Sequence, residues 1–143
     1  MVGTDFWFTF PLNIGATSST PAPGDNQIGV VSGCNVTGYY EFPALGIGPV
    51  AFTVSPGAAT TISVPAQDHT VSEQIEGKGI HIVTDNRVAV YAVDYSPFTV
   101  DGEAVLPTPR LGTSYVLQGY TSSTASSQFT VFATQDNTVV TMT

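Results

Sequence analysis

The stretch RVAVYAVDYSPFTVDGEAVLPTPRLGTSYVLQGYTSSTASSQFTVFATQDNTVVTMT (residues 87–143) decides the fold class. Short β-branched and aromatic runs alternate in it with Gly, Pro, Ser and Asn, and no helical pattern interrupts them. This alternation of strand formers and turn formers is typical of a many-stranded antiparallel domain. The same stretch contains almost no residue suited to acid, base or nucleophilic chemistry.

The same pattern continues through the rest of the chain and predicts about eleven short strands. We place them at 5–10, 27–32, 35–42, 51–54, 60–64, 79–84, 87–94, 104–106, 114–120, 128–134 and 138–143. Two-residue turns are expected at Asp85-Asn86 and Asp136-Asn137, and a type II turn at Pro56-Gly57. We therefore predict one all-β domain over residues 1–143, an antiparallel two-sheet β-sandwich of about ten strands. A jelly roll or a distorted barrel is the alternative.

Two of the predicted strands have a distinct pattern of faces. Residues 6, 8 and 10 are all Phe, so one face of the first strand is expected to be buried and aromatic, with Trp7 on the other face. The apolar residues of 87–94 are continuous, which predicts a central strand buried on both faces.

The composition excludes some classes of function. Charged residues make up 10% of the chain and the net charge is −8, which opposes binding to nucleic acid and docking on anionic lipid. The longest clean apolar run, Val88 to Val93, is six residues, whereas a membrane-spanning helix needs about 20. A surface of neutral polar residues indicates an extracellular or cell-surface protein, and an acidic cytosolic β protein is the alternative. The abrupt ends, without a signal peptide, lead us to expect a module cut from a longer secreted or surface protein.

Few residues are candidates for catalysis or zinc binding. His69, His81 and Cys34 are the only histidines and the only cysteine, and they lack zinc-ligand spacing. Asp68-His69 is a weak candidate dyad without a nucleophile elbow. His81 lies between two isoleucines, so we expect it on the opposite strand face as a surface or hydrogen-bonded histidine. We therefore predict that the protein is not an enzyme.

The acidic residues offer one candidate metal site. Asp94, Asp101 and Glu103 flank one predicted loop, and calcium is bound by carboxylate and carbonyl oxygens. The alternative is a solvated turn in which Asp and Gly serve the backbone geometry. Calcium is the only cofactor that the sequence leaves open.

Five segments, in this order, carry a resemblance to a known family. They are GTDFWFTFPLN (3–13), FTVSPGAATTISVP (52–65), IEGKGIHIVTDNRVAVYAVD (75–94), LPTPRLGTSYVLQGY (106–120) and FTVFATQDNTVVTMT (129–143). The chain resembles bacterial modules of the IgGFc-binding-protein N-terminal domain family. The resemblance implies a non-enzymatic extracellular module with an all-β fold, in proteins that often carry adhesion-type repeats. It transfers no ligand and no binding residue.

Two functions follow as hypotheses. In the first, the chain is a binding or adhesion module of a bacterial surface or secreted protein, with a protein or a glycan as ligand. In the second, it is a structural subunit that assembles with copies of itself into a filament, layer or shell, because a β-rich chain with few charges favours edge-to-edge contact. Large aromatic rings either fill the core or stack on sugars; they are Trp7, Tyr39, Tyr40, Tyr95, Tyr115 and Tyr120.

Overall fold

The computed structural model describes residues 1–11, 26–65, 74–96, 99–119, 127 and 129–143. Over these residues the chain forms seven antiparallel strands, two short 3-10 turns and no α-helix. The strands are β1 (Gly3–Phe8), β2 (Asn26–Val31), β3 (Val36–Phe42), β4 (Ile47–Val54), β5 (Ala59–Val64), β6 (Ile80–Ser96) and β7 (Thr99–Ala104). The 3-10 turns are η1 (Pro43–Leu45) and η2 (Thr108–Arg110). No helix among the described residues has the length and apolarity needed to cross a bilayer.

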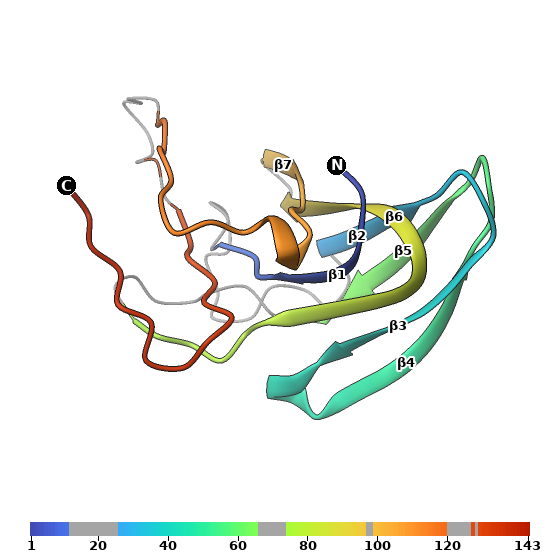
Figure 1. Cartoon of the computed structure of the whole chain (residues 1–143), viewed down its shortest axis with the longest axis horizontal. Helices are drawn as coiled ribbons and strands as arrows, with labels where there is room; N and C mark the ends of the chain where they lie inside the picture. The colour runs from blue at the N-terminus through green and yellow to red at the C-terminus, as the bar shows by residue number, and fades with distance from the viewer. Residues whose placement is uncertain (12–25, 66–73, 97–98, 120–126, 128) are drawn as a thin grey trace.

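β6 organises the sheet, because four other strands pair with it. Its first part pairs with β1 and β3, and its last part pairs with β2 and β7. β4 then adds to β3 and β5 adds to β2, which gives the order β4-β3-β6-β2-β5. Between the two sets of partners β6 bends, and Figure 1 shows the sheet curling back there, with β3 and β4 on one limb and β2 and β5 on the other.

The core lies inside this curl and draws on both limbs. The predicted aromatic face of the first strand is confirmed, since Phe6, Phe8 and Phe10 are all buried. Full burial of one such side chain contributes about 1.5–3 kcal/mol. The other buried apolar residues are Ile28, Val30, Val36, Phe42, Val54, Ile62, Val64, Ile80, Ile82, Val88, Val90, Ala92 and Val105. β1 and the first part of β6 each bury one face, which leaves the opposite face available for a site.

The turn between β4 and β5 is the predicted one. The Ala58 N–H donates to the Ser55 carbonyl at 3.3 Å, and Gly57 has a φ of 80°. A type II turn requires positive φ at its third residue, which glycine adopts without a steric penalty. The Pro56-Gly57 prediction is therefore confirmed.

The predicted turn at Asp85-Asn86 is wrong. β6 runs without a break through these residues, so the strands expected at 79–84 and 87–94 are one strand. β6 pairs with β1 and β3 before the bend and with β2 after it, and this pairing keeps the backbone extended through two residues that are typical of a turn. The central position of 87–94 is confirmed, but burial on both faces is wrong, because Tyr91 is 45% exposed.

The region after β6 also differs from expectation. The predicted loop at 95–103 contains β7, which ends where the strand at 104–106 was expected to begin. Within the described parts of 114–120, 128–134 and 138–143 there is no strand, so those three predictions are wrong. The turn at Asp136-Asn137 does form, with Asn137 at a φ of 60°.

The predicted class, all-β and antiparallel, is confirmed. The structure shows one curled sheet of seven strands over the described residues. Its division into two sheets of a sandwich stays a prediction.

Candidate functional site

The outer face of β1, β3, β4 and the first part of β6 carries a group of polar and aromatic side chains. Because successive side chains of a strand point to opposite faces, burial of Phe6 and Ile82 on the inside places their neighbours outside. In the register, Trp7 and Glu41 both lie opposite His81. Three neighbouring strands therefore present one row of side chains on this face.

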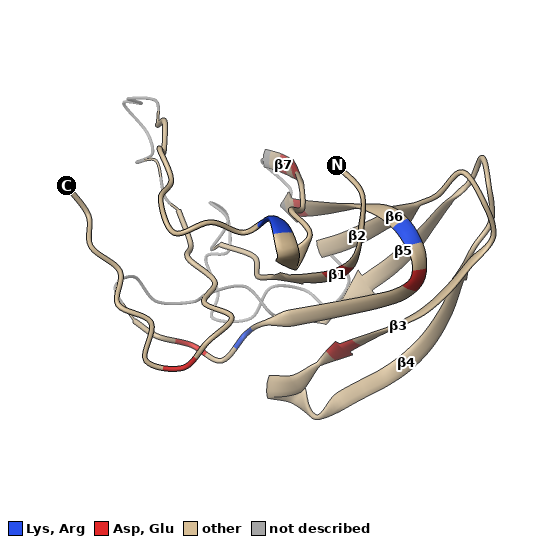
Figure 2. Cartoon of the chain, in the orientation of Figure 1, with Lys and Arg blue, Asp and Glu red and all other residues tan. Residues whose placement is uncertain are grey.

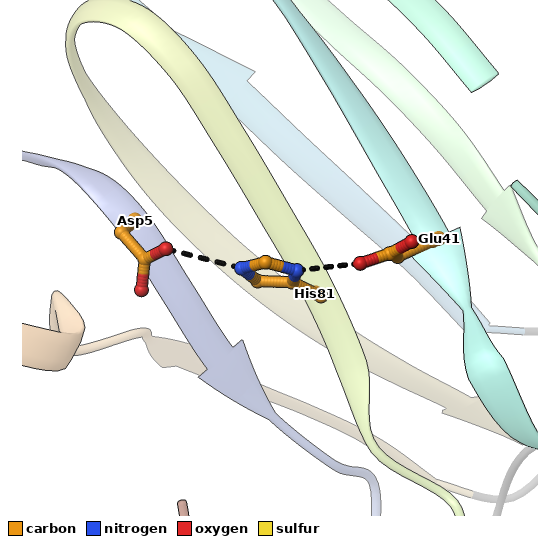
Figure 3. A network of polar contacts seen from close by, with 3 residues as sticks. All are labelled: Asp5, Glu41 and His81. Atoms are coloured by element: carbon orange, nitrogen blue, oxygen red, sulfur yellow. Dashed lines mark hydrogen bonds and ion pairs between the residues drawn. The ribbon is translucent and has the colours of Figure 1, made fainter. Parts of the chain in front are cut away.

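His81 lies at the centre of this row, between two carboxylates (Figure 3). Its Nδ1 is 2.7 Å from Glu41 Oε1, and its Nε2 is 3.0 Å from Asp5 Oδ2. A carboxylate can only accept hydrogen bonds, so both contacts are hydrogen bonds when both ring nitrogens carry protons. The imidazolium form is thus paired on both sides, and the side chain is only 13% exposed.

Aromatic rings enclose the imidazole. Trp7 stacks on His81, with ring centroids 4.0 Å apart and planes 8° from parallel, and Tyr39 meets His81 edge-on at 6.2 Å. Phe132, from the C-terminal segment, stacks on Trp7 at 5.5 Å. A Cβ on Gly79 would lie 2.5 Å from the Phe132 ring, so glycine lets this segment lie close against the start of β6. We call Asp5, Trp7, Tyr39, Glu41, His81 and Phe132 the His81 cluster.

The His81 cluster ties three strands together. Asp5, His81 and Glu41 come from β1, β6 and β3, and charge-assisted hydrogen bonds of this kind are stronger than neutral ones. The prediction that His81 is a surface or hydrogen-bonded histidine on the face opposite the isoleucines is confirmed. Because both ring nitrogens face carboxylates, neither is directed at a hydroxyl nucleophile.

A shallow groove of about 860 Å³ adjoins the His81 cluster and shares Tyr39 with it. Its lining is largely apolar and uncharged, with Asp85 as the one ionisable acid. The lining residues are Thr37, Gly38, Tyr39, Pro49, Ala51, Phe52, Thr53, Val83, Thr84 and Asp85. The groove therefore combines an aromatic ring, apolar floor groups, hydroxyls and one carboxylate on a rigid sheet surface.

Thr37 holds the Asp85 carboxylate in place. The Thr37 backbone N–H donates to Asp85 Oδ1 at 3.0 Å, and the Thr37 hydroxyl donates to Asp85 Oδ2 at 2.7 Å. These hydrogen bonds, from the side chain first and then from the backbone, hold the pKa of Asp85 below its ordinary value. Asp85 is thus a fixed negative acceptor at the end of the groove.

A second hollow, of about 470 Å³, has the opposite electrostatic character. It lies where β1 begins and η2 ends, and its lining includes Arg87 and Arg110, two of the three basic residues of the chain. Met1, Val2, Gly3, Thr4, Pro107 and Pro109 complete the lining, none of them an acid. In an acidic protein this hollow is the place that suits an anionic group.

The calcium candidates are only partly brought together. Asp94 and Asp101 are opposed in the β6–β7 register, and Glu103 is opposite Ala92. Asp94 is buried whereas Asp101 and Glu103 are exposed. Neighbouring atoms exclude part of the water around the Glu103 carboxyl, and this desolvation raises its pKa. Within the described residues, no group of three or more His, Cys, Asp or Glu side chains is placed to hold a metal ion. Calcium binding by these residues stays a prediction.

Three other sequence candidates remain, namely Asp68, His69 and Cys34. Asp68 and His69 lie outside the described residues. Cys34 is an exposed free thiol, 3.6 Å from Ser32 Oγ.

Sequence reasoning missed the partners of His81. Asp5 and Glu41 are far from His81 in the sequence, and no motif links them. The only available signal was strand alternation, which places Asp5 and Trp7 together on the face opposite the Phe residues. Which strands become neighbours was not readable from that pattern.

No protein-family model, curated protein or solved structure matches the chain. The resemblance to the IgGFc-binding-protein N-terminal domain family therefore stays a prediction.

Proposed function

We propose that this protein is a non-enzymatic binding module of an extracellular or cell-surface protein, with a neutral glycan as its ligand. The observation that carries the proposal is the open groove on the outer face of β3, β4 and β6, beside the His81 cluster. The low content of charged residues, 10% of the chain, supports an extracellular setting. Adhesion through glycan contacts is the biological role that fits such a module.

The lining of the groove matches the chemistry of a neutral sugar. A pyranose has an apolar face that packs on an aromatic ring, and Tyr39 supplies a ring at the edge of the groove. Its hydroxyls need acceptors and donors, which Asp85, Thr37 and Thr53 offer. The carboxylate of Asp85 and the net charge of −8 disfavour an anionic ligand at this place.

The site is also pre-organised. Tyr39 lies on β3 between paired strands and contacts His81 edge-on, and Asp85 is held by two hydrogen bonds from Thr37. Groups that are already held in one arrangement lose little conformational entropy on binding. The smaller loss of entropy matters most for a ligand that binds weakly, such as a monosaccharide unit.

The geometry supports a non-enzymatic role. His81 is the only histidine among the described residues, and both of its ring nitrogens face carboxylates. General base catalysis by a histidine needs a ring nitrogen within hydrogen-bond reach of the proton that is removed. The arrangement of His81 instead favours a fixed structural role beside the groove.

A glycan array that includes neutral and acidic glycans tests the proposal, with the labelled wild-type chain and three variants. We expect binding to neutral glycans, its loss in Tyr39→Ala, and its loss in Ala51→Trp, which fills the groove without removing a contact. Tyr91→Ala is the matched control, because Tyr91 is an exposed tyrosine on the other part of β6. Circular dichroism verifies the fold of each variant.

Two results would overturn the proposal. Neutral glycan binding that survives both Tyr39→Ala and Ala51→Trp would exclude the groove. Binding restricted to acidic glycans or to polypeptides would exclude a neutral glycan ligand. Binding of acidic glycans would indicate the hollow lined by Arg87 and Arg110 as the binding site.

A self-assembling structural subunit is the second candidate function. It is favoured by β4 and β5, which end the strand order of the sheet and each pair with only one strand among the described residues. Unpaired edges of this kind are templates for another chain. Light scattering over a range of concentrations separates this candidate from a monomeric binding module.

A further inference from the structure

β2 and β3 follow each other along β6, and β5 and β4 pair with their far sides, so β4 and β5 together form one edge of the curled sheet. This edge contains no charged residue. Its sequences, IGPVAFTV and ATTISV, are drawn without any blue or red in Figure 2. Natural sheets usually protect their edges with charges, proline or bulges. β4 contains Pro49, and its pairing with β3 has a register shift between Tyr40 and Phe42. β5 has no proline, and its pairing with β2 has no register shift. β5 is therefore the less protected part of this edge.

The C-terminal segment Thr138–Thr143 is the natural complement of such an edge. Its sequence, TVVTMT, combines high β-propensity, no charge, no proline and no glycine, which is typical of segments that add to sheets. The segment nevertheless forms no strand, and Val139, Val140 and Met142 are 88%, 55% and 75% exposed. Figure 1 shows it running away from the curled sheet.

We propose that residues 138–143 of one copy add as a strand to the outer edge of β5 in a second copy, an edge that pairs with no strand among the described residues. The inference rests on the second candidate function, self-assembly, and names the two surfaces that meet. Both are six residues long, so a full antiparallel ladder can form between them. The new ladder pairs the backbone N–H and C=O groups of both strands.

Charge favours this edge over the opposite one. The chain has a net charge of −8, so two copies repel each other except where their surfaces are neutral. β1 and β7, which pair with the other side of β6, include Asp5, Asp101 and Glu103. The uncharged β5 edge and the uncharged segment 138–143 allow the closest approach between copies.

The contact is heterologous, because the donor segment and the acceptor edge are different surfaces of one chain. Each copy can therefore donate to one neighbour and accept from another. A contact of this type produces rings when the rotation closes and open filaments when it does not.

Two variants separate the donor from the acceptor. Val140→Lys places a charge in the donor segment, and Ser63→Lys places one on the exposed side of the acceptor strand. Both positions are exposed, so the fold of the single chain is retained. Val116→Lys is the matched control, since Val116 is 99% exposed and lies outside both surfaces. Size-exclusion chromatography with light scattering gives the mass at each concentration.

We expect the wild-type chain and Val116→Lys to assemble as concentration rises. Each of the other two variants should raise the concentration for half-association roughly tenfold or more. A mixture of Val140→Lys and Ser63→Lys should give a dimer, because one variant can still accept and the other can still donate.

The outcomes distinguish the inference from the function on which it rests. A wild-type chain that stays monomeric at every concentration overturns both. Assembly that is as strong in Val140→Lys and Ser63→Lys as in the wild type overturns this contact and leaves self-assembly standing. A mixture that stays monomeric overturns the heterologous arrangement.

Discussion

Trp7 lies flat on His81, with the ring centroids 4.0 Å apart and the planes 8° from parallel. The two residues are register partners on β1 and β6, although most of the chain separates them in sequence. Trp7 is the only tryptophan of the protein, so its fluorescence reports on this one contact. Phe132 stacks on Trp7, so residues 129–143 contact β1 through this ring.

Replacing His81 with Leu should lower the free energy of unfolding by about 1–3 kcal/mol, because Asp5 and Glu41 lose their shared partner. Chemical denaturation followed by Trp7 fluorescence and by circular dichroism measures the loss. The triple variant Asp5→Asn, His81→Leu, Glu41→Gln should recover part of it, since neither neutral amide is left as an unpaired charge. A His81→Leu variant as stable as the wild type would show that the two carboxylate contacts contribute nothing.

Phe132→Ala should expose the outer face of Trp7 to water. We expect a red shift of the tryptophan emission and stronger quenching by acrylamide, because the ring that covers Trp7 is removed. Phe129→Ala is the matched control, as Phe129 belongs to the same segment but is 50% exposed. Equal spectra for the two variants would contradict the stack.

Gly38→Ala should destabilise the sheet. A Cβ at this position would lie 2.4 Å from the Val83 carbonyl oxygen and 2.7 Å from a Thr84 methyl group, so β3 and β6 must move apart. We expect a loss of about 1–3 kcal/mol in the free energy of unfolding, the usual cost of overpacking.

Gly29→Ala is the control for this substitution, because a Cβ on Gly29 of β2 meets no atom within 4 Å. We expect it to be neutral or stabilising by about 0.4–1 kcal/mol, since alanine reduces the entropy of the unfolded chain. Thermal unfolding of both variants measures the difference. If Gly29→Ala is the more damaging change, the close approach of β3 and β6 at Gly38 is wrong.

Asp85 should titrate below the ordinary range of an aspartate. The Thr37 hydroxyl and backbone N–H stabilise its ionised form, so the folded-state pKa is lower than the unfolded one. The resulting stabilisation is present above the unfolded-state pKa and is lost as the pH falls through the folded-state pKa.

Carboxyl NMR titration measures this pKa directly. In Thr37→Val, which removes the hydroxyl, the pKa of Asp85 should rise toward its ordinary value. An unchanged pKa in that variant would show that the Thr37 hydroxyl is not the main cause.

Local patterns in the sequence predicted much of the fold. Alternation predicted the buried Phe6, Phe8 and Phe10 and placed His81 on the outer face. The Pro56-Gly57 turn followed from the conformational freedom of glycine. These features depend on neighbouring residues alone, which is why a single sequence reveals them.

Other features depended on which strands meet. Asp85-Asn86 has turn-forming residues, yet long-range pairing on both sides keeps β6 extended through them. The segments 128–134 and 138–143 have strand-forming sequences, yet their described residues pair with no strand. Local propensity sets what a segment can form, and partner strands decide whether it does.

The sequence by itself thus determined the all-β class, the inward aromatic face and the position of His81 on the opposite face. Only the tertiary structure decided that Asp5, His81 and Glu41 form one row and that Tyr39 borders a groove beside them. The physical reason is that side-chain direction follows a two-residue period within one strand, whereas neighbours across a sheet depend on the register between distant segments.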